Sequence, residues 1–295
     1  MIGPFIDSTF TSLISYQIYL SLVRITCTFV ISSLRRRRWT CCPIIVGTNV
    51  LLKYLQTIYS KIKLGADISF HSGTKYLAGH SDALIGTVTV SPTSHRGRTL
   101  HPLIKAVQIS SGGVASPWDS WLTLRGMRTL HLRVERQCQS AMKLAEYLEE
   151  KRIQTTISRT TTTASSKEDN NRHTTIAGGV WAVHYPGLPS HPQHDVATKQ
   201  MKDGYGGVLS FELEDEIAAT AFAGAVRIAQ RATSLGGTET LIEHRASIEP
   251  PDKITSPPGL LRVSVGLEDV NDLIHDFDTA FAIVKQVLSS SSSSG

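Results

Sequence analysis

The densest cluster of side chains able to do chemistry lies between His71 and Asp82 of the 295-residue sequence. Within this cluster, Ser72, Thr74 and Lys75 bring two hydroxyls and an amine together. A lysine amine can form a Schiff base with a carbonyl compound, and neighbouring hydroxyls can donate hydrogen bonds to a phosphate. The cluster therefore permits covalent catalysis with a phosphorylated cofactor. A surface lysine that merely follows a strand is the alternative.

The spacing Ser72-x-x-Lys75 also matches the nucleophile pattern of β-lactamases and penicillin-binding proteins, in which the serine attacks an acyl carbon. That pattern needs a Ser-Asp-Asn element and a Lys-Thr-Gly strand further along the chain. Here Ser81 and Asp82 are followed by Ala83, and Lys-Thr-Gly does not occur. The sequence therefore disfavours acyl transfer by Ser72.

Composition indicates a globular protein with one large domain or two of ordinary size, since hydrophobic residues make up 41% and charged residues 19%. The net charge of +5 is uneven, because residues 8–66 contain no acidic residue and residues 35–38 are all arginine. No aromatic or Gly-rich recognition pattern accompanies this basic run, so the sequence disfavours nucleic-acid binding. The four cysteines show no metal-knuckle or disulfide spacing, which predicts a reducing, cytoplasmic setting.

Residues 10–34 form the one candidate membrane segment. Their length would suffice, but Gln17 and Arg24 interrupt the apolar run, and a central arginine costs about 2.5–3.5 kcal/mol. A weak anchor or a targeting peptide remains an alternative. We favour a protein without a membrane segment, in which residues 1–43 form an N-terminal stretch outside the fold.

Elements that could position the lysine cluster begin at about residue 44. We expect a strand at 44–46, a helix over 51–64 and a strand over 66–71 that ends in the cluster. A further strand is expected over 83–90. Strand, helix and strand in this order predict a parallel α/β sheet, with the cluster at the carboxyl end of one strand, where such folds place ligand sites.

The second half of the sequence alternates helices and strands as α+β domains do. Helical periodicity covers 121–150 in one helix or two, and 155–175 is a Thr-rich, low-complexity stretch that we expect to be an exposed loop. Further elements are expected as strands at 180–185, 206–213 and 260–265, helices at 216–232 and 270–287, and a flexible tail at 289–295.

Several blocks together resemble the Cys/Met-metabolism PLP enzymes, the family of cystathionine γ-synthase, the cystathionine lyases and methionine γ-lyase. The blocks, in the order that the family keeps, are Ala66–Asp82, Ser116–Leu130, Tyr185–His194, Ser234–Gly237, Leu241–His244 and Leu261–Glu268. The resemblance runs from about residue 44 to 287. It implies an α/β, fold-type I PLP-dependent transferase, with an incomplete, mostly parallel large domain over 44–133 and an α+β small domain over 134–288.

The resemblance also implies a role for each site residue. Lys75 would form the Schiff base with pyridoxal 5'-phosphate and then carry protons, while Ser72 and Thr74 would hold the cofactor phosphate. Arg262 would pair bidentately with the substrate α-carboxylate, with Ser234 beside it. Without the resemblance, a solvated arginine on a strand is the favoured interpretation of Arg262.

The same resemblance implies partners but no metal. The substrate would be cystathionine, an O-acyl-homoserine or a cysteine-like amino acid, and copies of the chain would form a homo-oligomer. His184, His191 and His194 lie close enough in sequence to suggest metal ligands, but the matching segment of the family is structural.

The sequence also departs from the family. Most of the stretch that precedes the lysine in family members is missing, and Gly47 occupies the place of the aspartate that keeps the pyridine nitrogen protonated. The leading expectation is a transsulfuration-type enzyme that eliminates or replaces at a C–S bond through Lys75. The alternative is a truncated, catalytically impaired chain, or a mis-assembled gene product, that only associates with full-length partners.

Overall fold

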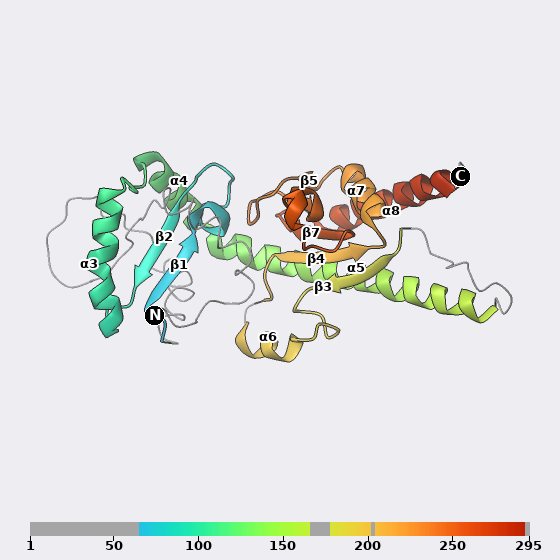
Figure 1. Cartoon of the computed structure of the whole chain (residues 1–295), viewed down its shortest axis with the longest axis horizontal. Coiled ribbons are helices and arrows are strands. Elements are labelled where there is room, and N and C mark those ends of the chain that lie inside the picture. The colour runs from blue at the N-terminus through green and yellow to red at the C-terminus, as the bar shows by residue number, and fades with distance from the viewer. Residues whose placement is uncertain (1–64, 166–177, 202–203, 293–295) are drawn as a thin grey trace. The chain divides into compact units, whose positions relative to one another are not determined.

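The computed structural model describes residues 65–165, 178–201 and 204–292. It divides the chain into two compact units, Met1–His131 and Leu132–Gly295 (Figure 1). The family resemblance predicts the division between residues 133 and 134. The expected elements at 44–46 and 51–64, and the candidate membrane segment at 10–34, lie outside the described residues. Within the described ranges, no helix has both the length and the apolar character needed to cross a membrane.

The described residues of the first unit form a two-stranded sheet and two helices. Its elements are β1 (Ile68–Ser72), the turn η1 (Gly73–Leu77), β2 (Gly86–Val90), α3 (His95–Ser110) and α4 (Pro117–Met127). Strands β1 and β2 pair antiparallel, with Ile68 opposite Val90. The predicted parallel arrangement rests on a strand at 44–46, which lies outside the described residues. The connection from β1 to β2 contains the short turn η1 and no crossover helix of the kind that usually joins parallel neighbours.

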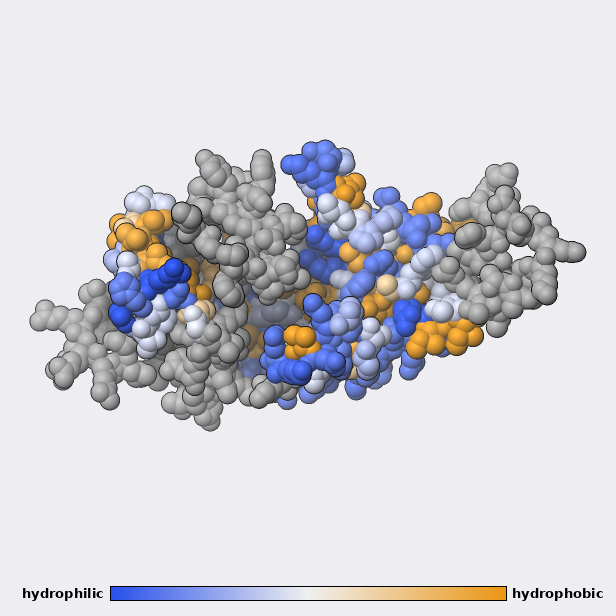
Figure 2. Space-filling view, turned by 60° about the horizontal axis from the view of Figure 1, so that its bottom comes forward, coloured by the Kyte–Doolittle hydropathy of each residue, from blue (hydrophilic) through white to orange (hydrophobic). Residues whose placement is uncertain are grey.

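Helix α3 was missed by the sequence reasoning because its periodicity is weak. Its apolar residues Leu103, Val107 and Ile109 are exposed. On the face of the molecule that Figure 2 shows, orange hydrophobic residues likewise lie among blue hydrophilic ones. The start of the helix is nevertheless encoded locally. The hydroxyl of Ser94 accepts a hydrogen bond from the N–H of Gly97 at 3.1 Å, which is a standard N-cap.

The second unit is built on a five-stranded sheet in the order β3-β4-β7-β6-β5. The strands are β3 (Val180–His184), β4 (Val208–Leu213), β5 (Gln230–Arg231), β6 (Leu241–His244) and β7 (Leu260–Ser264). Its helices are α5 (Leu130–Ser165), α6 (His194–Gln200), α7 (Glu216–Ala225) and α8 (Val270–Ser292), with short 3-10 turns at Ala246–Ile248 and Pro251–Lys253. Only the β5–β6 pair is parallel among these strands, which agrees with the predicted α+β character.

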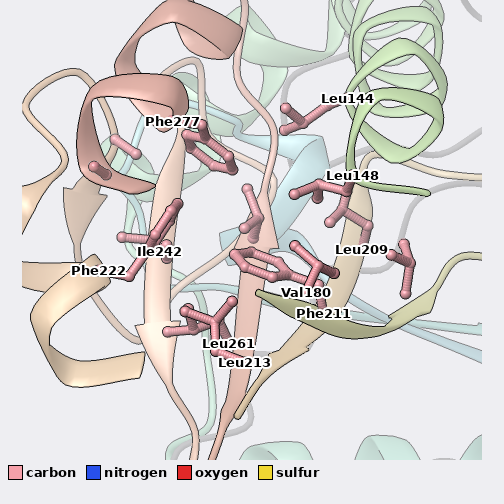
Figure 3. Packing of buried hydrophobic residues seen from close by; sticks show 14 of the residues in the cluster. Leu144, Leu148, Val180, Leu209, Phe211, Leu213, Phe222, Ile242, Leu261 and Phe277 are labelled. Carbon is pink, nitrogen blue, oxygen red and sulfur yellow. The ribbon is translucent and has the colours of Figure 1, made fainter. Parts of the chain in front are cut away.

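One face of this sheet forms the core of the second unit. Phe211 on β4, Phe222 on α7 and Phe277 on α8 are fully buried, and their rings contact one another with centroids 5.2–6.2 Å apart. Leu144 and Leu148 of α5 belong to the same cluster, as Figure 3 shows. Burial of each such side chain contributes about 1.5–3 kcal/mol, so this face fixes the strands that carry the polar side chains of the opposite face.

Helix α5 continues to Ser165, which corrects the expected loop from residue 155 onward. The side chains of Thr155, Thr156 and Ser158 each donate a hydrogen bond to the carbonyl four residues earlier, at 2.8–3.0 Å. These bonds satisfy the hydroxyls within the helix, so a Thr-rich composition does not end it. Residues 166–175 of the expected loop lie outside the described ranges.

Two other element ends differ from expectation. Helix α7 ends at Ala225 rather than near 232, because the carboxylate of Asp276 on α8 accepts the backbone N–H groups of Arg227 and Ile228 at 2.8 and 2.9 Å. Helix α8 extends through Ser292, into the expected tail, with the hydroxyls of Ser289 and Ser290 bonded to carbonyls of the preceding turn.

Candidate active site

Lys75 lies on the turn η1, directly after β1, where the sequence placed it. Its φ of −85° and ψ of −128° interrupt the helical turn, and its side chain is half-buried. The carbonyls of Gly73 and Lys75 accept the N–H groups of Ala78 and Gly79 at 2.9 and 2.8 Å. The backbone on both sides of the lysine is therefore held in place by local hydrogen bonds.

Thr74 fastens this turn to the start of β2. The Thr74 N–H donates to the carbonyl of Ile85 at 3.0 Å, and the Ile85 N–H donates to Thr74 Oγ1 at 3.0 Å. The hydroxyl proton is directed at the same Ile85 carbonyl, 3.3 Å away. Because a hydroxyl has one proton to give, Thr74 must break this bond before it donates to a phosphate. The role of Thr74 in holding the phosphate stays a prediction. In the structure its side chain joins the lysine turn to β2.

Ser72 has a different setting. It is exposed at the end of β1, and its hydroxyl does not cap the following turn. Its proton is therefore available to a ligand, whereas that of Thr74 is engaged.

Helix α4 packs directly against the backbone that follows the lysine. A Cβ atom on Gly126 would lie 2.0 Å from the carbonyl oxygen of Ala78, so only glycine allows this approach. Leu77 packs with Met127, and Ala78 packs with Leu122. The sequence reasoning missed the role of Gly126, although a glycine inside a helix without a turn signal indicates close packing.

The other two predicted site residues, Ser234 and Arg262, lie in the second unit and are adjacent there. Arg262 is on β7, where its Nη2 atom donates to the carbonyl oxygens of Thr233 at 2.8 Å and Ser234 at 3.1 Å. Burial lowers the pKa of Arg262, and the nearby Glu243 carboxylate partly opposes this shift. Arg262 is thus half-buried and held by hydrogen bonds, rather than solvated. The functional roles of Ser234 and Arg262 remain predictions.

A polar row crosses the sheet on the face opposite the core. The register aligns His184, Ser210, Arg262 and Glu243 on β3, β4, β7 and β6. Glu243 is ion-paired to both Arg262 and Arg245, and only 3% of its side chain is exposed. Sequence reasoning did not identify Glu243 or Arg245, although both lie in or beside a block that it quoted.

The histidines considered as metal ligands have other partners. His184 Nε2 lies 2.6 Å from a carboxylate oxygen of Glu212, and His194 Nδ1 lies 2.9 Å from the carbonyl of Pro186. In the part of the chain that the structure describes, no group of three His, Cys, Asp or Glu side chains is arranged to hold a metal ion.

The candidate site residues therefore fall into two sets. Ser72, Thr74 and Lys75 belong to the first unit, and Ser234 and Arg262 belong to the second. The residues present in each set fit a phosphorylated carbonyl cofactor and a carboxylate, respectively. Gly47 lies outside the described residues.

Comparison with known proteins identifies the family. The family model for "Cys/Met metabolism PLP-dependent enzyme" matches residues 44–282. A cystathionine beta-lyase of Coxiella burnetii is 38% identical over 236 residues, covering 76% of this chain and 52% of the relative. A cystathionine gamma-lyase of Saccharomyces cerevisiae is 36% identical over 246 residues, covering 80% and 54%.

Comparison with solved structures finds proteins of the same kind. The crystal structure of an apo methionine gamma lyase from Micromonospora echinospora superposes with a TM-score of 0.58 and 34% identity, covering 75% of this chain and 50% of that one. The chain spans about half the length of the curated relatives that it matches.

Proposed function

Because the chain belongs to the Cys/Met metabolism PLP-dependent enzyme family, we propose that Lys75 is its cofactor lysine. We propose further that its reaction eliminates or replaces at the C–S bond of a sulfur amino acid. The observation that carries this proposal is the lysine turn, in which a half-buried lysine lies on a backbone held by hydrogen bonds and by the close approach of α4. The predicted PLP-dependent fold is confirmed by the solved relatives over the part that they cover.

The residues around Lys75 fit the cofactor of this family. Bound pyridoxal phosphate supplies an electron-withdrawing ring that stabilises negative charge on the substrate carbon next to the amino group. Lys75 Nζ is the group that would hold the cofactor covalently and later carry a proton to or from that carbon. The exposed Ser72 hydroxyl would donate to the phosphate, while Thr74 keeps the turn in place.

Arg262 would bind the α-carboxylate of the substrate. A guanidinium suits this task because it is planar and carries two parallel N–H donors on each open edge. Its setting supports the role, since the carbonyls of Thr233 and Ser234 and the carboxylate of Glu243 orient it on β7. Cystathionine, O-acyl-homoserines and cysteine-like amino acids all carry the required carboxylate. We propose that the protein acts in the cytoplasm as a homo-oligomer, as its cysteine usage and its family lead us to expect.

Cofactor binding tests this proposal most directly. Pyridoxal phosphate added to the full chain should give an absorbance band near the visible edge, and borohydride reduction should fix the cofactor on the peptide that contains Lys75. Lys75→Ala should lose both signals. Lys285→Ala, which removes an exposed lysine of α8, is the matched control and should keep both. Label on another lysine, or the absence of any band, would contradict the assignment.

Product analysis then separates the reaction types. The holoprotein incubated with L-cystathionine should release pyruvate with homocysteine if it cleaves on the β side, or 2-oxobutyrate with cysteine if it cleaves on the γ side. Release of neither product, with the cofactor bound, would exclude both lyase reactions.

A further inference from the structure

The guanidinium of Arg262 already has a carboxylate partner inside the protein. Glu243 lies directly opposite Arg262 in the β6–β7 register, so the two side chains project from the same face of the sheet as cross-strand neighbours. A carboxylate oxygen of Glu243 accepts from Arg262 Nη2. The same nitrogen also donates to the carbonyls of Thr233 and Ser234.

This choice of nitrogen matters for binding a second carboxylate. A guanidinium gives two parallel hydrogen bonds through either of two edges, one formed by Nε and Nη2 and the other by Nη1 and Nη2. Both edges include Nη2, which has two protons and already faces three acceptors. An incoming carboxylate therefore cannot be held bidentately by Arg262 unless one of these acceptors gives up its place on Nη2, and Glu243 is the one that carries a competing negative charge.

Arg245 offers Glu243 a second partner. Arg245 Nη1 donates to the carboxylate oxygen of Glu243 that Arg262 does not contact. Arg245 is itself held by Glu249 at 3.7 Å, and Glu249 accepts the N–H of Thr255 at 2.7 Å and the hydroxyl of Ser256 at 2.6 Å. Glu243 can thus leave Arg262 without becoming an unpaired buried charge, which would be costly.

We propose that Glu243 is an internal carboxylate that competes with the substrate α-carboxylate for Arg262, and that Arg245 retains Glu243 when substrate binds. The identity of the ligand rests on the proposed function, whereas the competition itself rests on the contacts within the second unit. Glu243 is a positioning residue in this scheme, because it acts on the substrate only through Arg262.

Two substitutions should shift carboxylate affinity in opposite directions. Glu243→Gln removes the competing charge and should tighten binding. Arg245→Gln leaves Arg262 as the remaining arginine partner of Glu243 and should weaken binding. Each change should be roughly three- to ten-fold, the size of the net contribution of one typical hydrogen bond. A purely structural role for the network predicts weaker binding in both variants.

The probe is propionate, titrated into the full chain with ¹⁵N-labelled arginine while the Arg262 Nε resonance is followed by NMR. The expected order of dissociation constants is Glu243→Gln below wild type, and wild type below Arg245→Gln. Weaker binding in both variants, equal constants, or no response of Arg262 in Glu243→Gln would overturn the proposal. If Glu243→Gln does not fold, Glu243→Asp takes its place, because its shorter side chain draws the carboxylate back from Arg262. It should bind propionate more tightly than wild type, and weaker binding would overturn the proposal.

A second measurement links the competition to turnover. The KM of the holoprotein for L-cystathionine should follow the same order, while kcat changes less. Propionate binding needs neither cofactor nor reaction, so the expected order without turnover would support the competition and contradict the proposed activity. Turnover together with a different order of dissociation constants would support the proposed activity and contradict the competition.

Discussion

Removal of the Thr74 hydroxyl and removal of the Ser72 hydroxyl, the two hydroxyls beside Lys75, should have different effects on stability and on cofactor binding. In Thr74→Val the Ile85 N–H loses its acceptor at 3.0 Å, and Ile85 is only 4% exposed. A buried donor without a partner costs about 1–3 kcal/mol. The Ile85 carbonyl still accepts from the Thr74 backbone at 3.0 Å, so loss of the 3.3 Å hydroxyl bond adds little. We expect the apo chain to lose about 1–3 kcal/mol of unfolding free energy.

The matched substitutions are Thr74→Ser and Ser72→Ala. Thr74→Ser keeps the hydroxyl and removes one methyl group, so its loss should stay below about 1 kcal/mol. Ser72→Ala removes an exposed hydroxyl and should change apo stability by less than about 0.5 kcal/mol. It should instead weaken pyridoxal phosphate binding about ten-fold, because it removes a hydrogen bond to a charged group.

Urea unfolding of the apo chain measures these stabilities, and Trp118 and Trp121 on α4 place fluorescent probes in the same unit. Titration with pyridoxal phosphate, followed by absorbance, measures the cofactor affinities. Unchanged stability in Thr74→Val, together with a loss of cofactor affinity like that of Ser72→Ala, would refute the structural role of Thr74. It would show instead that the Thr74 hydroxyl serves the phosphate.

Three further predictions concern the scaffold. Gly126→Ala should destabilise the chain by about 1–3 kcal/mol in urea unfolding, because its Cβ would meet a carbonyl oxygen at 2.0 Å. The control is Gly224→Ala, whose Cβ meets nothing within 4 Å and which should stabilise the chain by about 0.5–1 kcal/mol. Equal effects of the two substitutions would contradict the packing argument. Asp276→Asn should cost about 1.5–3 kcal/mol, since the carboxylate accepts backbone N–H groups after α7, and hydrogen exchange there should quicken. Hydrogen bonds from Ser256 and Thr255 lower the pKa of Glu249 to about 2, so the stability it adds is present above its unfolded pKa and is lost as pH falls toward 2. The Thr255 amide resonance should titrate near that pH, and a midpoint above 4 would show that these bonds are weak.

Much of the second unit could be predicted from the sequence. The strands at Val180–His184 and Leu260–Ser264 and the helix from Val270 have strong local patterns, and each was found within a few residues. The lysine cluster was equally visible, because its hydroxyls and amine are neighbours in the sequence itself.

Other features depend on contacts between distant segments, and no local pattern encodes these. Helix α7 ends at Ala225 because Asp276, far along the chain, takes the N–H groups beyond it. The strand after the lysine turn pairs antiparallel because the chain returns directly to its neighbour.

The same distinction applies to the candidate site. The sequence by itself determined which residues could hold a cofactor and a carboxylate, since residue type and spacing suffice for that. Only the tertiary structure decided their state: Thr74 is tied to Ile85, and Arg262 is paired with Glu243. The physical reason is that a hydroxyl has one proton and a guanidinium nitrogen two, so the neighbours that folding brings determine what remains for a ligand.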